Sequence, residues 1–294
     1  MAFTLATING RAALVVGDQY FDIAAISGGE VGPDPMSVFA RPDRLMALAG
    51  GLSPDQSHGV LSNAALGAPV PRPGKAFGIG LNYQEHADEA SLEVPDNPVV
   101  FAKFPNCITG PFDNVEMRSD RCDYEGELVV VVGPGGKDIP EERAWDHVFG
   151  LTVGQDISDR AVQLASKPPH FDLGKSFDTF GPIGPVVKSV DEFTDPGNLQ
   201  IRTFVNGELR QEDTTANLIF SVPVLVSYLS RITTLKPGDV IFTGTPSGVG
   251  MVQKKWLADG DRVRTEIEGI GVMENRCVRV SDHQLPLRRK SAST

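Results

Sequence analysis

The sequence predicts a β-rich α+β fold with two domains. Short strand-like runs bounded by turn residues recur from Phe77 onward, and few helical patterns interrupt them. Strands and helices do not alternate regularly, so a doubly wound parallel sheet is not expected. The connector Ala68–Gly74 contains three prolines, which disfavour both helix and central strand. It separates a small N-terminal α/β domain, residues 1–70, from a larger domain, residues 71–282.

The N-terminal domain is expected to hold short strands and one or two helices. Its predicted strands, Ala12–Val16 and Tyr20–Ile23, lie on either side of a Gly-Asp turn. In the larger domain the predicted strands are rich in β-branched and aromatic residues, which suit a pleated surface. They are Val99–Phe104, Leu128–Val132, Leu151–Gln155, Pro185–Val187, Leu199–Val205, Val240–Thr243, Arg262–Glu268 and Val272–Val280.

Helices are predicted at three places in the larger domain. The best-marked one follows Ser221, a candidate cap, and has Pro223 in its first turn. Its apolar residues fall at helical spacing, at Val222, Leu225, Val226 and Leu229. Two further helices are expected over Asp159–Ala165 and near His86. Residues 283–294 are predicted to be a solvated, disordered tail.

Composition and charge restrict the partners of the chain. Its 294 residues, 40% hydrophobic and 22% charged, are typical of a globular protein. The net charge of -11 argues against nucleic acid, because phosphate binding needs clustered Lys and Arg. No apolar run reaches the roughly 20 residues of a membrane span. Three cysteines without paired spacing and an N-terminus without a basic, targeting-type segment predict a reduced cytoplasmic protein.

The carboxylates of the stretch Asp123-Tyr-Glu-Gly-Glu127 carry the strongest chemical signal. A buried-looking Leu-Val-Val-Val-Val run follows them and predicts a strand, on which Glu125 and Glu127 would project from one face. Asp123 would share that face if the strand extended so far. Carboxylates crowded beside an apolar run need positive compensation, and a hard divalent cation with oxygen ligands would supply it. The alternative is an exposed strand end whose acids are solvated.

Two other segments could supply a general base and a cation. His86 and Glu89 are three residues apart and would share one face of a helix, where the carboxylate could orient the imidazole. A surface histidine would give the same pattern. Lys175 lies in a segment otherwise rich in turn residues. The alternative interpretation is that Lys175 is an ordinary solvated lysine.

Polar residues also follow two of the predicted strands. Asp156, Arg160 and Gln163 would lie on roughly one side of a helix, although Asp156 could be a cap and Arg160 a surface partner of a nearby aspartate. Thr245 lies in a glycine-rich turn after a strand. That turn has no helical pattern after it, so a dinucleotide site is not expected. Gly174-Lys-Ser176 resembles the end of a phosphate-binding loop, but Pro169 stands where the first glycine of that loop would be, so this loop is not expected either.

Taken in order, these segments resemble the fumarylacetoacetate hydrolase family, and the details are similar to its domain-containing-protein branch. The resemblance covers about residues 74–280. The matching stretches are Gly80–Glu89, Pro98–Pro111, Asp123–Gly133, Gly154–Gln163, Gly174–Pro185, Val205–Gly207 and Leu235–Gly250. It implies a mixed β-roll or sandwich catalytic domain and a homodimer.

The resemblance also implies roles for particular residues. The metal would be Mg²⁺ or Mn²⁺, with Ca²⁺ as a substitute, held by Glu125, Glu127 and Asp156. The catalytic residues would be His86 and Glu89 on a lid, and Lys175 as the partner of a developing oxyanion. Substrate would contact Tyr83, Arg160, Gln163 and Thr245.

The activity implied by this resemblance is metal-dependent hydrolysis of a C–C bond in a small 2,4-dioxo acid such as an acylpyruvate. The leaving fragment would be a pyruvate enolate. The same residues could instead serve an oxaloacetate decarboxylase or tautomerase, or an isomerase of 2-oxo-dienedioates. A different class of function is also possible from the sequence, namely a non-catalytic protein module that binds a metal ion and an oxo acid.

Overall fold

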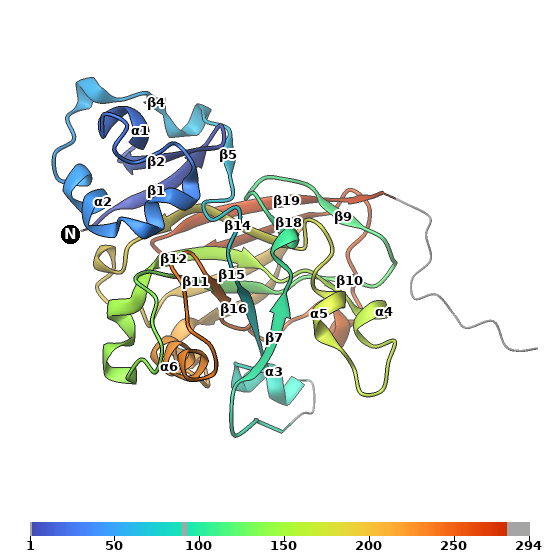
Figure 1. Cartoon of the computed structure of the whole chain (residues 1–294). Helices are drawn as coiled ribbons and strands as arrows, with labels where there is room; N and C mark the ends of the chain where they lie inside the picture. The colour runs from blue at the N-terminus through green and yellow to red at the C-terminus, as the bar shows by residue number, and fades with distance from the viewer. Residues whose placement is uncertain (1, 90–92, 281–294) are drawn as a thin grey trace, which may run out of the picture.

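A computed structural model describes residues 2–89 and 93–280, and it contains two large sheets (Figure 1). The larger, 12-stranded sheet follows the path β4-β3-β2-β1-β14-β12-β11-β17-β6-β7, with β5 beside β1 and β8 beside β14. Its strands are β1 (Thr4–Ile8), β2 (Arg11–Val16), β3 (Gln19–Asp22), β4 (Gly59–Val60), β5 (Leu66–Gly67), β6 (Ala76–Gly80), β7 (Val99–Lys103), β8 (Ile108–Thr109), β11 (Gly126–Val132), β12 (Val148–Gln155), β14 (Gly181–Lys188) and β17 (Val240–Phe242).

A five-stranded sheet packs across one face of the larger sheet. Its order is β16-β15-β18-β19-β9, and β15, β18 and β19 contact β11, β12 and β14. The strands are β9 (Val115–Met117), β15 (Gln200–Val205), β16 (Glu208–Thr214), β18 (Arg262–Ile267) and β19 (Gly271–Arg279). A separate short pair joins β10 (Cys122–Asp123) to β13 (Ser158–Asp159).

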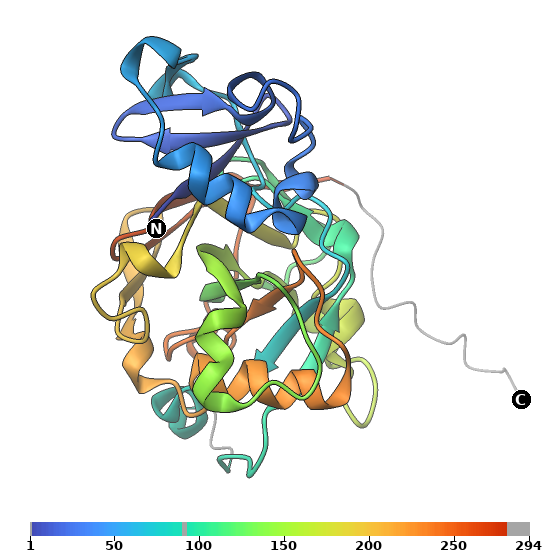
Figure 2. The ribbon, with the colours of Figure 1, turned by 60° about the vertical axis from the view of Figure 1, so that its left-hand side comes forward.

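The helices are short and lie around the sheets. They are α1 (Ile23–Ile26), α2 (Pro42–Ala49), α3 (Gln84–Glu89), α4 (Arg160–Gln163), α5 (Phe171–Gly174), α6 (Val222–Ile232) and α7 (Gly250–Gln253). Figure 2 shows α2 with the N-terminal elements at one end of the molecule and α6 at the other. Among the residues that the structure describes, no helix has the length and apolarity needed to cross a membrane.

The central strand β11 explains the run of four valines. Leu128 and Val130 belong to the core between the two sheets, whereas Val129 and Val131 pack into a second core with N-terminal residues such as Phe39. A strand buried on both faces needs consecutive apolar residues instead of alternating ones. The valine run is therefore fixed by burial on both sides of the sheet.

The predicted β-rich α+β fold is confirmed, and some predicted boundaries need correction. The Asp159–Ala165 helix is shorter than predicted, because α4 ends at Gln163. Ser221 occupies the N-cap position of α6, but its side chain makes no capping hydrogen bond. The predicted tail, residues 283–294, lies outside the described residues.

The division into two domains at residue 70 stays a prediction. The elements before it are short strands and two helices, as expected. However, β1 pairs with β14, so the N-terminal strands extend the same hydrogen-bonded sheet that carries the central strands. Backbone pairing across the proposed boundary ties the two units together.

Helix α6 offers a test of the core. The Leu225 side chain is fully buried in the core between the sheets, whereas Ile232 at the end of the same helix is 65% exposed. We expect Leu225→Ala to lower the free energy of unfolding by about 2–5 kcal/mol, because it removes buried methyl groups and leaves a cavity. Ile232→Ala should change it by less than about 1 kcal/mol. Urea denaturation of both variants measures the difference, and equal losses would contradict this packing.

Candidate active site

Three buried carboxylates converge where β11 begins and β12 ends. Glu127 lies on β11, Glu125 immediately precedes that strand, and Asp156 immediately follows β12. The antiparallel pairing of Gly126 with Gln155 places the two strand ends side by side. The Asp156 amide donates to the Glu125 carbonyl at 2.8 Å. One oxygen from each of the three carboxylates lies within 4.8 Å of the other two.

The structure brings Glu125 and Glu127 together in a different way from the one that the sequence predicted. Because β11 begins at Gly126, Glu125 and Glu127 are not two residues of one regular strand. Glu125 is fixed instead by the Gln155 side chain, whose Oε1 accepts from the Glu125 amide at 3.0 Å. Asp123 lies on β10 and does not join the three carboxylates.

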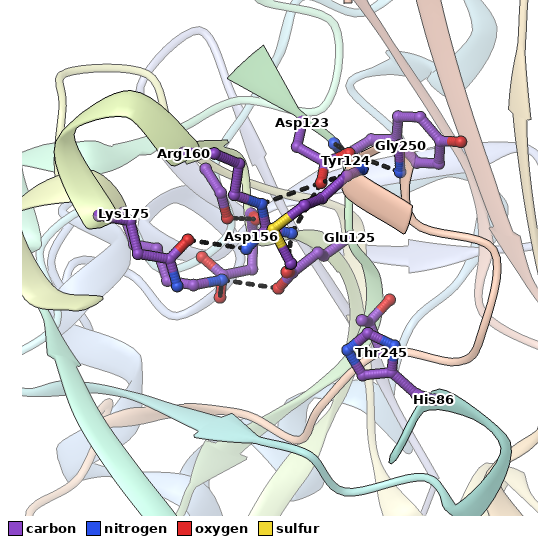
Figure 3. Close-up of polar contacts among 12 residues, drawn as sticks. His86, Asp123, Tyr124, Glu125, Asp156, Arg160, Lys175, Thr245 and Gly250 are labelled. Carbon is purple, nitrogen blue, oxygen red and sulfur yellow. Dashed lines mark hydrogen bonds and ion pairs between the residues drawn. The ribbon is translucent and has the colours of Figure 1, made fainter. Parts of the chain in front are cut away.

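Three buried cations surround the carboxylates. Lys175 Nζ lies 2.6 Å from both Glu125 Oε2 and Asp156 Oδ2. Lys103 Nζ lies 2.6 Å from Asp156 Oδ1. The Arg160 guanidinium contacts Glu125 (Figure 3). The acids are therefore not solvated at an exposed strand end, which was the alternative interpretation of this stretch.

The two glutamates have opposite pKa shifts. Burial and repulsion by Asp156 and Glu125 raise the pKa of Glu127 well above its ordinary value. Burial would also raise the pKa of Glu125, but Lys175 and Arg160 outweigh it and lower this pKa to about 2. The nearby cations thus favour the charged form of Glu125 more than that of Glu127.

This donor set fits a hard divalent cation. Such ions take carboxylate oxygens as ligands and keep waters or substrate oxygens in the remaining positions. Three buried carboxylate oxygens are close enough together to share one ion, and repulsion by Asp156 and Glu125 adds to burial in raising the pKa of Glu127. In this structure the Lys175 ammonium supplies part of the compensating charge.

The pKa of Glu127 gives a testable pH dependence. A carboxyl group with a raised pKa holds its proton to higher pH, and that proton must leave before the oxygen can bind an ion. We expect Mn²⁺ binding to release protons and to weaken as the pH falls. Titration calorimetry in buffers of different ionisation enthalpy measures the release. A binding enthalpy independent of the buffer would contradict this expectation.

His86 and Glu89 form a hydrogen-bonded pair on α3. Glu89 Oε1 lies 2.9 Å from His86 Nδ1, and the Gly248 amide donates to both Glu89 oxygens at 3.0 Å. With Nδ1 held, Nε2 is the nitrogen offered to a ligand. The Gly248 contact also fastens α3 to the loop that contains Thr245. Figure 3 shows His86 and Thr245 on one side of Glu125, with Arg160 and Lys175 on the other.

Arg160 is held by several acceptors at once. Its guanidinium contacts Asp123 and Glu125, and its NH1 atom donates to Gln163 Oε1 at 2.9 Å. The aspartate that pairs with Arg160 is therefore Asp123, and not Asp156 or Asp159 close to it in the sequence. Asp123 in turn accepts from the amides of Gly250 and Met251, at 2.7 and 3.0 Å, and so joins Arg160 to the start of α7.

A small cavity of about 100 Å³ opens beside the carboxylates. Six predicted site residues line it, namely His86, Glu125, Arg160, Gln163, Lys175 and Thr245. Apolar walls come from Phe101, Phe171 and Met251. Hollows of about 570 and 600 Å³ lie elsewhere on the molecule, but neither is lined by the carboxylate cluster. The chemistry of the lining residues therefore makes the cavity of about 100 Å³ the candidate active site.

Tyr83 lies outside the cavity lining, whereas Thr245 belongs to it. Tyr83 is fully buried, and its contact with a substrate stays a prediction. Burial, Asp213 and Glu127 raise its pKa. Thr245 lines the cavity, but its hydroxyl donates to the Gly126 carbonyl and accepts from Gln211 Nε2. Its bonds therefore also hold the start of β11 in place.

Sequence reasoning missed the supporting residues Lys103, Gln155 and Gln211. Gln211 Oε1 accepts from the Gly126 amide at 3.0 Å, and Gln155 fixes Glu125. Lys103 could have been noticed, because it shares a strand face with the apolar residue Phe101. The two glutamines gave no local signal, since their partners are distant in sequence.

Comparison with known proteins agrees with this geometry. The family described as "Fumarylacetoacetate (FAA) hydrolase C-terminal" matches residues 75–278. The chain belongs to the fumarylacetoacetate hydrolase family. A fumarylacetoacetate hydrolase domain-containing protein 2 homolog from Dictyostelium discoideum is 46% identical over 73% of this chain and 74% of its own. The resemblance found in the sequence, including the domain-containing-protein branch, is thus confirmed.

Two further members of the family have names that specify a reaction. The oxaloacetate tautomerase YisK of Bacillus subtilis is 44% identical over 74% of each chain. Maleylpyruvate hydrolase from Sphingobium sp. SYK-6, in complex with manganese(II) and pyruvate, is 30% identical, with a TM-score of 0.81, covering 95% of this chain and all of that one.

Proposed function

We propose that this family member is a metal-dependent enzyme that interconverts the keto and enol forms of a small 2-oxo acid, with oxaloacetate as the favoured substrate. The observation that carries this proposal is the cavity of about 100 Å³, which is lined by Glu125 of the acidic cluster, by Lys175 and by His86, the hydrogen-bond partner of Glu89. Pockets for drug-sized ligands are several times larger. A four-carbon acid suits this space better than a long acyl chain.

The metal site would consist of Glu125, Glu127 and Asp156, with Mg²⁺ or Mn²⁺ as the ion and Ca²⁺ as a substitute. The manganese of the related maleylpyruvate hydrolase supports this choice. When bound, such an ion supplies Lewis acidity toward a carboxylate and an adjacent oxo oxygen. The ligands are held by backbone pairing of β11 with β12, so the site is preorganised.

His86 would move the proton. Its Nδ1 is fixed by Glu89, so Nε2 takes a proton from C3 of the substrate. The C3–H bond breaks, the C2–C3 bond becomes double, and the imidazolium of His86 passes the same proton to the 2-oxo oxygen, which gives the enol and restores the neutral imidazole. In the reverse direction the imidazole takes the proton of the enol hydroxyl and returns it to C3. The Glu89 carboxylate stabilises the positive charge that His86 carries between these steps.

Lys175 would stabilise the oxygen on which negative charge develops. Its side chain is buried, lines the cavity and lies beside Glu125 and Asp156. A charged donor in a site shielded from water is worth more than the same donor in solution. Arg160 and Gln163 line the same cavity and would contact the substrate carboxylates.

Hydrolysis of a C–C bond in an acylpyruvate, the activity first expected from the resemblance, is the second candidate. It is supported by the 30% identity to maleylpyruvate hydrolase and by the same histidine–glutamate pair, which could activate water. We place tautomerisation first, because the relative with that name is 44% identical. Both reactions start from a 2-oxo acid in the same cavity. The predicted homodimer and cytoplasmic location stay predictions.

One experiment separates the candidates. The enol absorbance of oxaloacetate is followed with Mg²⁺ or Mn²⁺, and products are identified by NMR. Faster enol–keto exchange with an unchanged carbon skeleton supports the tautomerase. Pyruvate formed from oxaloacetate indicates a decarboxylase, and acetate plus pyruvate formed from acetylpyruvate indicates a hydrolase. Inertness toward both, combined with metal binding, indicates a binding module and refutes an enzyme acting on these acids.

A further inference from the structure

Lys103 is a fully buried lysine whose place the proposed reaction does not explain. Its side chain has no exposed surface, and it lies at the end of β7, next to the acidic cluster. Removing an ammonium group from water is costly unless charge and hydrogen bonds compensate it. The residues around its nitrogen should therefore reveal its role.

Three acceptors satisfy the three N–H donors of Lys103. Nζ donates to Asp156 Oδ1 at 2.6 Å, to the Phe180 carbonyl at 3.1 Å and to the Lys175 carbonyl. An ammonium group has only three donors, so Lys103 has none left for a substrate. It also does not line the cavity.

Lys175 differs from Lys103 in both respects. Its nitrogen donates to Glu125 Oε2 and Asp156 Oδ2, and its side chain lines the cavity. Among the described residues, these two bonds leave a third donor for a ligand. The two lysines thus bracket Asp156, with Lys103 on Oδ1 and Lys175 on Oδ2.

We propose that Lys103 is a positioning residue for the metal site. Its bond to Oδ1 fixes the plane of the Asp156 carboxylate, so that Oδ2 is directed toward Lys175 and Glu125. Its bond to the Lys175 carbonyl holds the backbone from which the catalytic lysine extends. This inference rests on the metal site of the proposed function, and it gives Lys103 a role separate from that of Lys175.

The test is Mn²⁺ affinity, measured by calorimetry on the full chain without substrate. We expect Lys103→Met to weaken Mn²⁺ binding by about 10–100-fold, as is typical when a residue that orients a ligand is removed. The matched control is Lys75→Met. Lys75 pairs with Asp239 at the same 2.6 Å, but at the other ends of β6 and β17 from the site. The control should retain wild-type Mn²⁺ affinity.

Lys103→Arg distinguishes positioning from charge balance. It keeps the positive charge, but a planar guanidinium cannot reproduce the three directions of an ammonium group. Positioning predicts at least about tenfold weaker Mn²⁺ binding, whereas charge balance alone predicts wild-type affinity. This variant also serves as the test if Lys103→Met does not fold.

A double-mutant cycle identifies the residue through which Lys103 acts. In an Asp156→Asn background, Lys103→Met should change Mn²⁺ affinity by less than about twofold, because the ligand it orients is already lost. Wild-type Mn²⁺ affinity in folded Lys103→Met or Lys103→Arg would overturn the assignment of Lys103. A wild-type protein that binds no Mn²⁺ would instead refute the metal site itself.

Discussion

Glu127→Gln should abolish activity and reduce Mn²⁺ affinity by more than about 100-fold. The change removes a charged oxygen ligand from the cluster of three but keeps the size of the side chain and its acceptor for the Gly244 amide. Removing a ligand should cost more than removing a residue that only orients one, for which about 10–100-fold is typical. Calorimetry with Mn²⁺ and the oxaloacetate assay measure the two effects.

The matched control is Glu212→Gln on the edge strand β16, a half-exposed glutamate paired with Arg202 on the neighbouring strand β15. It should leave Mn²⁺ affinity and turnover unchanged, because an exposed ion pair contributes little. A Glu127→Gln variant with wild-type affinity would exclude Glu127 as a ligand. The side-chain amide of this variant also has no ionisable proton like the one that Glu127 must release. Any residual Mn²⁺ binding should therefore release fewer protons.

His86→Asn should lower kcat by about 10²–10⁴-fold while Mn²⁺ affinity stays at the wild-type level. The imidazole is the proposed general base, and loss of such a group typically has this effect on rate. Its ring is held by Glu89, which is outside the proposed ligand set, so the three carboxylates should keep their arrangement without it. The assay is steady-state tautomerisation of oxaloacetate at saturating Mg²⁺.

The control for His86 is His58→Asn, which lies in the N-terminal part, where the ring accepts from the Asp22 amide. It should retain full activity. If the enzyme proves to be a hydrolase, His86→Asn should stop hydrolysis but spare decarboxylation, which needs no activated water. Unchanged tautomerisation in His86→Asn would assign the proton transfer to another group.

The sequence predicted those features that depend on local patterns. The valine run after Glu127 predicted β11, and the spacing of Val222, Leu225 and Leu229 predicted α6, because burial imposes a period on both elements. Strand β16 was missed, since Glu208–Thr214 is polar and lies at a sheet edge, where pairing instead of burial decides the conformation.

The candidate site shows the same limit. Glu125 and Glu127 were found because acids next to an apolar strand are unusual in themselves, whereas Asp156 was assigned to the same site only through the family resemblance. Gln155 and Gln211 escaped notice, because their partners are set by strand register across distant segments. The family resemblance supplied what local patterns could not, namely which acids meet.

The position of the acidic cluster at the end of β11 has a consequence for how an ion could come and go. Because that strand is covered on both faces and paired on both edges, it should be among the last segments to open through thermal fluctuations. Helix α3, in contrast, contacts the neighbouring loop through hydrogen bonds of Glu85 with Ser247 and of Glu89 with Gly248. An ion should therefore enter and leave from the side of α3 while the three carboxylates keep their arrangement. The measured enthalpy of ion binding should then contain no contribution from folding of the site.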